Sequence, residues 1–530
     1  MYRTLAAVLA AASLGACSSM TGEAPAPAAP EAPMVQLVQD VHSFARPNDA
    51  RVTHVDLDLA ADFQRRVLSG TATLDIRTAP GAEEIVLDVR DLNIRSVRSE
   101  AGPLQWRLGE EVEFLGRPLI IGLTPGVRQI MIDYETSPDA AALQWLSPSQ
   151  TAGGDQPYMF SQGQAILTRT WVPTQDSPGI RQTYSARIVA PEGLRAVMSA
   201  EMLTPDGEPV AGGRAYRFRL DHPVPPYLIA IGIGDIEFEG IGPRTGVFTE
   251  AEMLDASAEE FSDLEQMVVA AEGLYGEYRW GRYDLLILPP SFPFGGMENP
   301  RLTFATPTII AGDGSLVSLV AHELAHSWSG NLVTNATWAD FWLNEGFTTY
   351  FENRIMEAMY GQDRALMLQA LGWRDMQATI AELPAADTRL HLDLDGRDPD
   401  EGMSDIAYEK GALFLRTIER LAGRERFDAW LRSYFDRNAF QPMTTEGFLA
   451  DLRANLIRGD AALEERLMLE EWIYQPGIPS NAVEPVSPAF AIVGQPAGTV
   501  PEVAKASAAW PTMAKAGETG STAFDGMPGW

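Results

Sequence analysis

An H-E-x-x-H segment at residues 322–326 constrains this chain more than any other feature of its sequence. On an α-helix, which turns about 100° per residue, His322 and His326 lie about 40° apart and share one face. The opposite side of the same helix carries an apolar stripe formed by Leu316, Val320 and Leu324. The segment therefore predicts a helix that packs on a core and presents two imidazoles to a cleft.

Two imidazoles one helical turn apart can bind the same zinc ion through their neutral nitrogens. Glu323 lies between them in angle, where a general base for a zinc-polarised water belongs. Catalytic zinc sites usually have three protein ligands and one open position. Glu345 lies near the start of the next expected helix, 340–360. We therefore expect one Zn²⁺ per chain, held by His322, His326 and Glu345. The alternative is a pair of surface histidines on an amphipathic helix.

Charge and cysteine content exclude several other classes of protein. The chain has 530 residues, with 40 Lys plus Arg against 72 Asp plus Glu, for a net charge of −32. Nucleic-acid binding needs a basic face, so we expect no nucleic-acid partner. The single cysteine excludes intramolecular disulfides and cysteine-based zinc or iron–sulfur sites.

The amino terminus has the pattern of a targeting segment. Residues 1–16 contain one basic residue, Arg3, followed by an apolar run that is too short to span a bilayer. The run ends in Leu-Gly-Ala before Cys17, which resembles the bacterial lipobox, and Ser18 resembles lipoproteins sent to an outer membrane. We expect a signal peptide at 1–16, a lipid anchor on Cys17, a Pro/Ala tether at 17–45 and a periplasmic location on the outer membrane. The alternative is a plain signal peptide with an incidental cysteine.

The hydrophobic period changes along the chain and predicts an α+β, multidomain protein. Residues 46–240 alternate with period two, as Val55, Leu57 and Leu59 do, which predicts a largely antiparallel β domain. Residues 241–480 are mainly helical in pattern, with one strand at 283–288. Helices are expected at 251–276, 315–329, 340–360, 409–422, 425–438 and 445–456. Residues 481–530 are rich in Ala, Pro, Gly and Ser and show no helical period.

The segment Gly295-Gly296-Met297-Glu298-Asn299 resembles the exopeptidase motif of the gluzincin aminopeptidases. The resemblance covers about residues 50–480 and is nearest to the leukotriene A(4) hydrolase branch, through 288–294 and 328–335. It implies a thermolysin-like catalytic domain and a substrate-binding role for the motif. A fixed carboxylate such as Glu298 forms a charge-assisted bond only with a free amine, which would restrict substrates to peptides with a free amino terminus.

The same resemblance assigns roles to three further residues. It implies that Gln164 is a second contact to the substrate amine, which the residues alone would not indicate. It implies that Tyr408 stabilises the tetrahedral oxyanion, whereas local sequence alone predicts a packed tyrosine at a helix start. It also matches Asp400 to an acidic residue used for epoxide hydrolysis, although Met403 replaces a tyrosine near the lipid site of the mammalian enzyme.

These features favour a zinc aminopeptidase over three other interpretations. The first is an aminopeptidase that also hydrolyses epoxides. The second is a non-catalytic, lipid-anchored peptide-binding protein, which is disfavoured because all the expected metal ligands and the general base are present. An endoprotease is disfavoured because Glu298 would block the chain on the amino-terminal side of the cut. The family's catalytic domain is normally followed by a large helical domain, and about 50 residues follow Pro479, so we expect that domain to be absent or truncated.

Overall fold

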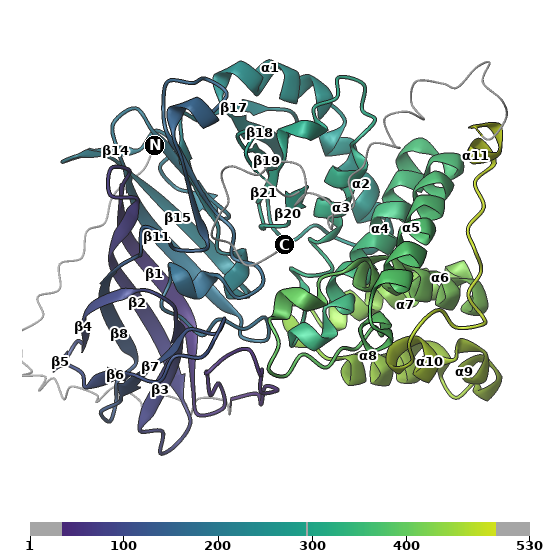
Figure 1. The fold of residues 1–530 in the computed structure, drawn as a ribbon, viewed down its shortest axis with the longest axis horizontal. Coiled ribbons are helices and arrows are strands. Elements are labelled where there is room, and N and C mark those ends of the chain that lie inside the picture. Colours follow the sequence, from purple (N-terminus) through teal and green to yellow (C-terminus); the bar gives the residue numbers. More distant parts are fainter. Residues whose placement is uncertain (1–33, 293–294, 494–530) are drawn as a thin grey trace, which may run out of the picture. The chain divides into compact units, whose positions relative to one another are not determined.

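The computed structural model describes residues 34–292 and 295–493, and residues 36–493 belong to one compact unit (Figure 1). The expected signal peptide, Cys17 and the tail beyond residue 493 lie outside the described residues. Among the helices of the described part, none is long and apolar enough to cross a membrane.

An amino-terminal β domain contains three sheets. The largest has nine strands in the order β13-β15-β11-β1-β2-β8-β4-β5, with β14 added beside β15. Its strands are β1 (Ala50–Asp62), β2 (Val67–Thr78), β4 (Asn93–Ser99), β5 (Gly102–Pro103), β8 (Gln129–Glu135), β11 (Gln182–Ala190), β13 (Glu201–Met202), β14 (Glu208–Val210) and β15 (Gly213–Val224). The two smaller sheets, ordered β3-β7-β6 and β12-β16-β10-β9, contain β3 (Glu84–Val89), β6 (Trp106–Leu108), β7 (Arg117–Gly122), β9 (Leu143–Leu146), β10 (Tyr158–Ser161), β12 (Arg195–Met198) and β16 (Ile231–Gly234).

The period-two pattern places apolar side chains in the core as expected. Val55, Leu57 and Leu59 of β1 are buried, while the intervening Asp56 and Asp58 are exposed. Most pairs are antiparallel, but β1 and β11 are parallel, with His54 opposite Thr183. Strand β3 departs from simple alternation because Asp88 is fully buried. There it accepts hydrogen bonds from the Ser43 hydroxyl and two backbone amides, which replace its lost hydration.

The second half of the chain joins a sheet to a group of helices. Its five-stranded sheet has the order β17-β18-β19-β21-β20, formed by β17 (Glu237–Gly240), β18 (Thr245–Thr249), β19 (Tyr283–Ile287), β20 (Gly296–Met297) and β21 (Leu302–Ala305). A small parallel pair is formed by β22 (Val333–Asn335) and β23 (Gln441–Met443). The α-helices are α1 (Ala251–Glu260), α2 (Leu264–Tyr275), α3 (Ser318–Ala325), α4 (Trp342–Tyr360), α5 (Gln362–Glu382), α6 (Gly411–Ala422), α7 (Arg424–Arg437), α8 (Thr445–Asp451), α9 (Ala461–Leu467), α10 (Leu469–Tyr474) and α11 (Pro488–Val493).

Several expected helices differ in extent from those observed. The prediction of one helix over 251–276 is wrong, because the chain breaks between α1 and α2 at residues 261–263. Helix α5 was not expected, and α11 lies in a segment expected to lack helix. The helix expected at 409–422 is preceded by a π-helical turn, η8 (Ile406–Lys410), and a second such turn, η9 (Leu452–Ile457), continues α8.

A close crossing of two helices brings the later functional residues together. Helix α4 packs on α3 and on α6, and β20 lies beside α3 (Figure 1). At the crossing of α4 and α6, a Cβ atom added to Gly346 would lie 2.7 Å from the Cα atom of Gly411. Only glycine at both positions permits this approach. It places Glu345, on α4, close to the turn η8 that precedes α6.

Candidate active site

The two histidines and Glu345 converge on one point. His322 lies on α3, and His326 follows the last residue of that helix. The Oε2 atom of Glu345 lies 3.3 Å from Nε2 of His322 and 3.5 Å from Nε2 of His326. This oxygen is buried and has no hydrogen-bond partner among the described residues. Three potential metal-ligand atoms thus face one another, within 4.8 Å.

The other nitrogen of each imidazole ring is held by a second residue. Nδ1 of His322 lies 3.1 Å from Oε2 of Glu352, and Nδ1 of His326 lies 3.0 Å from the carbonyl oxygen of Ser329. A proton on Nδ1 leaves Nε2 as the free acceptor nitrogen, so both rings present a lone pair to Glu345. Neither Glu352 nor Ser329 was identified from the sequence. Glu352 follows Glu345 by two helical turns, a spacing that could have indicated it.

This donor set fits a zinc ion. Two neutral imidazole nitrogens and one carboxylate oxygen form one of the ligand sets of catalytic zinc. A buried carboxylate oxygen without a partner is costly, and a bound cation would supply the missing interaction. The residues that would hold this cation are His322, His326 and Glu345, which form the metal-binding group.

Glu323 lies on α3 between the two histidines and is buried. Burial raises the pKa of its carboxyl group well above its usual range, and the neighbouring carboxylates of Glu298 and Glu345 add to this effect. A bound divalent cation would act in the opposite direction by favouring the ionised form. Gly296 of β20 lies directly against Glu323, because a Cβ atom there would come within 2.3 Å of Oε1 of Glu323.

Glu298 follows β20 and is 4% exposed. Its carboxylate, that of Glu323 and a ring nitrogen of His326 all lie within 4.8 Å of one another. Burial raises the pKa of Glu298 to about 6, and hydrogen bonds from the side chains of Tyr227 and Asn344 oppose the rise. Its Oε1 atom is buried with no hydrogen-bond partner in the described part of the chain. A carboxylate with a free, buried oxygen therefore stands beside the metal-binding group.

Three further residues of the motif directly precede Glu298, and Tyr408 faces the metal-binding group. Gly295 and Gly296 precede Met297, which is buried on β20 and pairs with Phe304 of β21. Tyr408 lies in η8, and its ring stacks on that of His322 at a centroid distance of 6.0 Å. Burial raises the pKa of Tyr408 well above its usual value, so its hydroxyl keeps its proton and can donate a hydrogen bond.

Gln164 and Asp400 are neighbours in the fold, although neither belongs to the metal-binding group. Gln164 lies in a turn after β10, and its Nε2 is buried without a partner among the described residues. Asp400 lies in the 3-10 turn η7 (Pro399–Gly402). Burial and the nearby Asp398 raise the pKa of Asp400 to about 8, and a hydrogen bond from the Ala165 amide opposes the rise. Met403, directly after η7, packs half-buried against the core.

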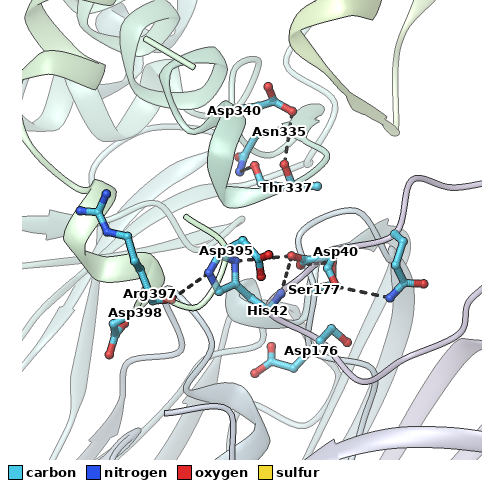
Figure 2. A network of polar contacts seen from close by, with 12 residues as sticks. Asp40, His42, Asp176, Ser177, Asn335, Thr337, Asp340, Asp395, Arg397 and Asp398 are labelled. Carbon is cyan, nitrogen blue, oxygen red and sulfur yellow. Dashed lines mark hydrogen bonds and ion pairs between the residues drawn. The ribbon is translucent and has the colours of Figure 1, made fainter. Parts of the chain in front are cut away.

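A buried polar network supports the loop that leads to Asp400 (Figure 2). The Ser177 hydroxyl donates to Oδ2 of Asp40 over 2.6 Å, and Nε2 of His42 lies 3.1 Å from the carbonyl oxygen of Arg397. The segment that contains Asp40 and His42 thus contacts both the β domain and the loop before η7. This network was not anticipated from the sequence, because its members are far apart along the chain.

Comparisons with known proteins find similar sequences and similar folds. The sequence matches the peptidase family M1 domain over residues 261–469 and the peptidase M1 N-terminal domain over residues 51–228. It is 41% identical over 464 residues to a leukotriene A-4 hydrolase of Xenopus laevis, a match that covers 85% of this chain and 75% of that protein. It is 38% identical over 460 residues to leucine aminopeptidase 2 of Sclerotinia sclerotiorum, with coverage of 83% and 75%.

Two solved structures are similar in fold. The structure of yeast LTA4 hydrolase in complex with bestatin superposes with a TM-score of 0.80 at 36% identity, and the match covers 84% of this chain and 71% of that one. An M1 zinc metallopeptidase from Deinococcus radiodurans superposes with a TM-score of 0.65 at 24% identity, over 85% of this chain and 100% of that one. The second likeness concerns the fold alone.

Proposed function

This chain belongs to peptidase family M1 and is a zinc aminopeptidase, and we propose that Glu298 selects the free amino terminus while Glu323 and Tyr408 act on the first peptide bond. The family resemblance seen in the sequence is confirmed by these matches. The roles of the individual residues are the proposal, and they rest on the positions of the side chains.

One observation carries the proposal: the carboxylates of Glu298 and Glu323 and a ring nitrogen of His326 lie within 4.8 Å of one another. In a peptide, the amino nitrogen and the first carbonyl carbon are separated by two bonds, or about 2.5 Å. An ammonium group bound to Glu298 therefore places only the first carbonyl beside the metal-binding group. Gln164, whose buried amide nitrogen has no partner among the described residues, is the proposed second contact in the amine site.

The reaction is divided among a few side chains. His322, His326 and Glu345 would hold a zinc ion, which would supply Lewis acidity and would lower the pKa of a water molecule towards about 7. Glu323 accepts a proton from the attacking water at its carboxylate and returns it to the leaving amine. Tyr408 donates a hydrogen bond from its hydroxyl to the developing oxyanion, and burial keeps that hydroxyl protonated. Burial of Glu298 strengthens its attraction for an ammonium group.

An assay with two anilides tests the proposal. We expect the protein to hydrolyse leucine anilide and to leave the N-acetylated form intact, because acetylation removes the charge that Glu298 binds. A chelator should abolish the activity, and added zinc should restore it. Hydrolysis of the acetylated anilide at a comparable rate would contradict amine selection.

Epoxide hydrolysis is a second candidate activity, and the position of Asp400 favours it. Its Oδ1 atom is buried with no hydrogen-bond partner among the described residues, and its carboxylate contacts the amide of Ala165, next to Gln164. The test is incubation with a lipid epoxide and detection of the diol by mass spectrometry. Asp400→Asn should abolish diol formation and leave hydrolysis of leucine anilide intact. Absence of diol with the unmodified chain would remove this activity.

We also propose that the chain is anchored to a bacterial membrane through a lipid on Cys17. The support is the sequence of residues 1–17, with an apolar run that ends in Leu-Gly-Ala-Cys. The expected location is the periplasmic side of the outer membrane. Mass spectrometry of the amino-terminal peptide and membrane fractionation of Cys17→Ser test this proposal. A Cys17→Ser protein that stays in the membrane fraction would contradict it.

A further inference from the structure

Tyr227 belongs to the β domain and reaches the amine site of the helical domain. It lies in the 3-10 turn η3 (Pro226–Leu228), is 1% exposed, and its ring packs against Trp338 at a centroid distance of 5.6 Å. Its hydroxyl accepts a hydrogen bond from Nδ2 of Asn344 over 3.3 Å. Asn344 immediately precedes the metal-ligand candidate Glu345. The hydroxyl thus connects the two domains at the functional site.

The orientation of Asn344 determines where the proton of Tyr227 goes. The side-chain oxygen of Asn344 lies on the side of His326, because a Cβ atom added to Gly330 would lie 2.5 Å from Oδ1 of Asn344 and 3.0 Å from Nδ1 of His326. The amide nitrogen of Asn344 points towards Tyr227. Because the tyrosine oxygen is the acceptor in that contact, its own O–H remains available as a donor. The Glu298 carboxylate, which forms a hydrogen bond with the Tyr227 side chain, is the acceptor within reach.

Both ends of Glu298 are therefore held by contacts that lead to the β domain. At the backbone, the carbonyl of Glu298 accepts a hydrogen bond of 2.8 Å from Nδ2 of Asn331, whose own carbonyl is bound by Arg181. At the side chain, Tyr227 and Asn344 both donate to the carboxylate. Oε1 of this carboxylate is buried and has no hydrogen-bond partner among the described residues. The carboxylate is thus contacted by two neighbouring side chains and keeps one unsatisfied oxygen.

We propose that Tyr227 is a positioning residue for amine recognition: its hydroxyl holds the carboxylate of Glu298 in the orientation that binds the substrate ammonium. This inference rests on the role proposed for Glu298 above. Asn344 donates to the tyrosine oxygen and the tyrosine donates to Glu298, and such a chain strengthens each of its hydrogen bonds. A carboxylate free to rotate would lose part of its charge-assisted bond to the ammonium.

Tyr227→Phe tests the inference, because it removes the hydroxyl and keeps the ring that packs on Trp338. Binding is measured by calorimetry for leucine hydroxamate and for 4-methylpentanohydroxamate, which lacks only the amine. We expect the variant to bind the amine-bearing ligand about tenfold more weakly and the other ligand within about twofold, as for loss of one hydrogen bond to a charged group. With leucine anilide, KM should rise about tenfold and kcat should change by less than about threefold.

Tyr184→Phe is the matched control. Tyr184 is also buried in the β domain, and its hydroxyl contacts Ser199 at 2.8 Å, away from the metal-binding group. The Tyr184→Phe variant should leave the ratio of its affinities for the two hydroxamates unchanged. A general loss of packing in Tyr227→Phe would weaken both hydroxamates alike, and that result would overturn the inference.

Glu298→Gln and the double variant with Tyr227→Phe complete a mutant cycle. If Tyr227 acts through Glu298, its substitution should have no further effect on the affinity ratio in the Glu298→Gln background. If Glu298→Gln loses amine discrimination and Tyr227→Phe keeps it, only the role of Tyr227 is wrong. If Glu298→Gln itself keeps full discrimination, the proposed function of Glu298 is wrong and the inference falls with it.

Discussion

Gly346→Ala should damage the active site without touching a catalytic side chain. The added Cβ would lie 2.7 Å from Cα of Gly411, 3.0 Å from its carbonyl carbon and 3.0 Å from the carbonyl oxygen of Ala407. Carbon atoms in contact prefer separations of about 3.5–4.0 Å, so α4 and α6 must separate by about 1 Å. These neighbours are backbone atoms and cannot rotate away as a side chain could. The separation would move Glu345 relative to Tyr408.

The magnitude follows from two opposing effects on stability and one on activity. Overpacking costs about 1–3 kcal/mol, while alanine gains up to about 1 kcal/mol over glycine in a helix. We therefore expect a net loss of about 0–2 kcal/mol in the free energy of unfolding. A displacement of about 1 Å at a catalytic site lowers the rate by about 100-fold, so kcat/KM should fall by about that factor.

Gly273→Ala is the matched control for this substitution. Gly273 is exposed on α2, and a Cβ atom added there would meet no heavy atom within 4 Å. It should keep full activity and gain up to about 1 kcal/mol of stability from helix propensity. The measurements are kcat/KM on leucine anilide, zinc content and thermal unfolding of both variants. Wild-type activity and stability in Gly346→Ala would refute the argument that the α4–α6 crossing sets the position of Glu345.

Three further substitutions test other parts of the site. Glu323→Gln should keep bound zinc, measured by metal analysis, and lose about 10²–10⁴-fold in kcat, because the proton acceptor is gone; near-normal turnover would contradict its role. Tyr408→Phe should lower kcat by about 10²–10³-fold with little change in KM, as expected for an oxyanion donor; a change in KM alone would be inconsistent with that assignment. Asp400→Asn tests how protonation of this residue affects stability. Burial raises the pKa of Asp400 to about 8, so the folded chain holds this proton to higher pH than the unfolded chain. The stability that this carboxyl group contributes is present at low pH and is lost as pH rises from about 4 to about 8. The melting temperature of Asp400→Asn relative to the unmodified chain should therefore rise between pH 5 and pH 8, and a constant difference would contradict the shift.

The metal-binding group was predictable because its signal is local. His322 and His326 are one helical turn apart, and Glu345 lies in the first turn of the long helix α4. Tyr227 was not predictable, since it reaches Glu298 only through the packing of the β domain on the helical domain. Glu352 lies between these cases: its spacing from Glu345 was visible, but its partner His322 is on another helix.

The errors in the predicted fold also have physical causes. Helix α5 buries small or scattered side chains such as Ala365, Ala370 and Gly372, so its apolar period is weak. The break between α1 and α2 contains neither Gly nor Pro. There the carboxylate of Glu260 binds the backbone amides of Gly312 and Gly314, a long-range contact that local sequence does not encode.

The residues proposed for hydrolysis are held within the helical half of the chain, whereas the residue proposed for amine recognition is held partly by the β domain. His322 and Glu323 lie on α3, His326 directly follows it, and Glu345 lies on α4. The ring nitrogens that face away from Glu345 are held within the same half of the chain. Glu298 is held differently, because Tyr227 and the Arg181–Asn331 contact tie it to the β domain. Substitutions at these β-domain residues should therefore change the affinity for a free amine while leaving zinc affinity intact. Zinc loss on removal of the Tyr227 hydroxyl would show that the two tasks are coupled.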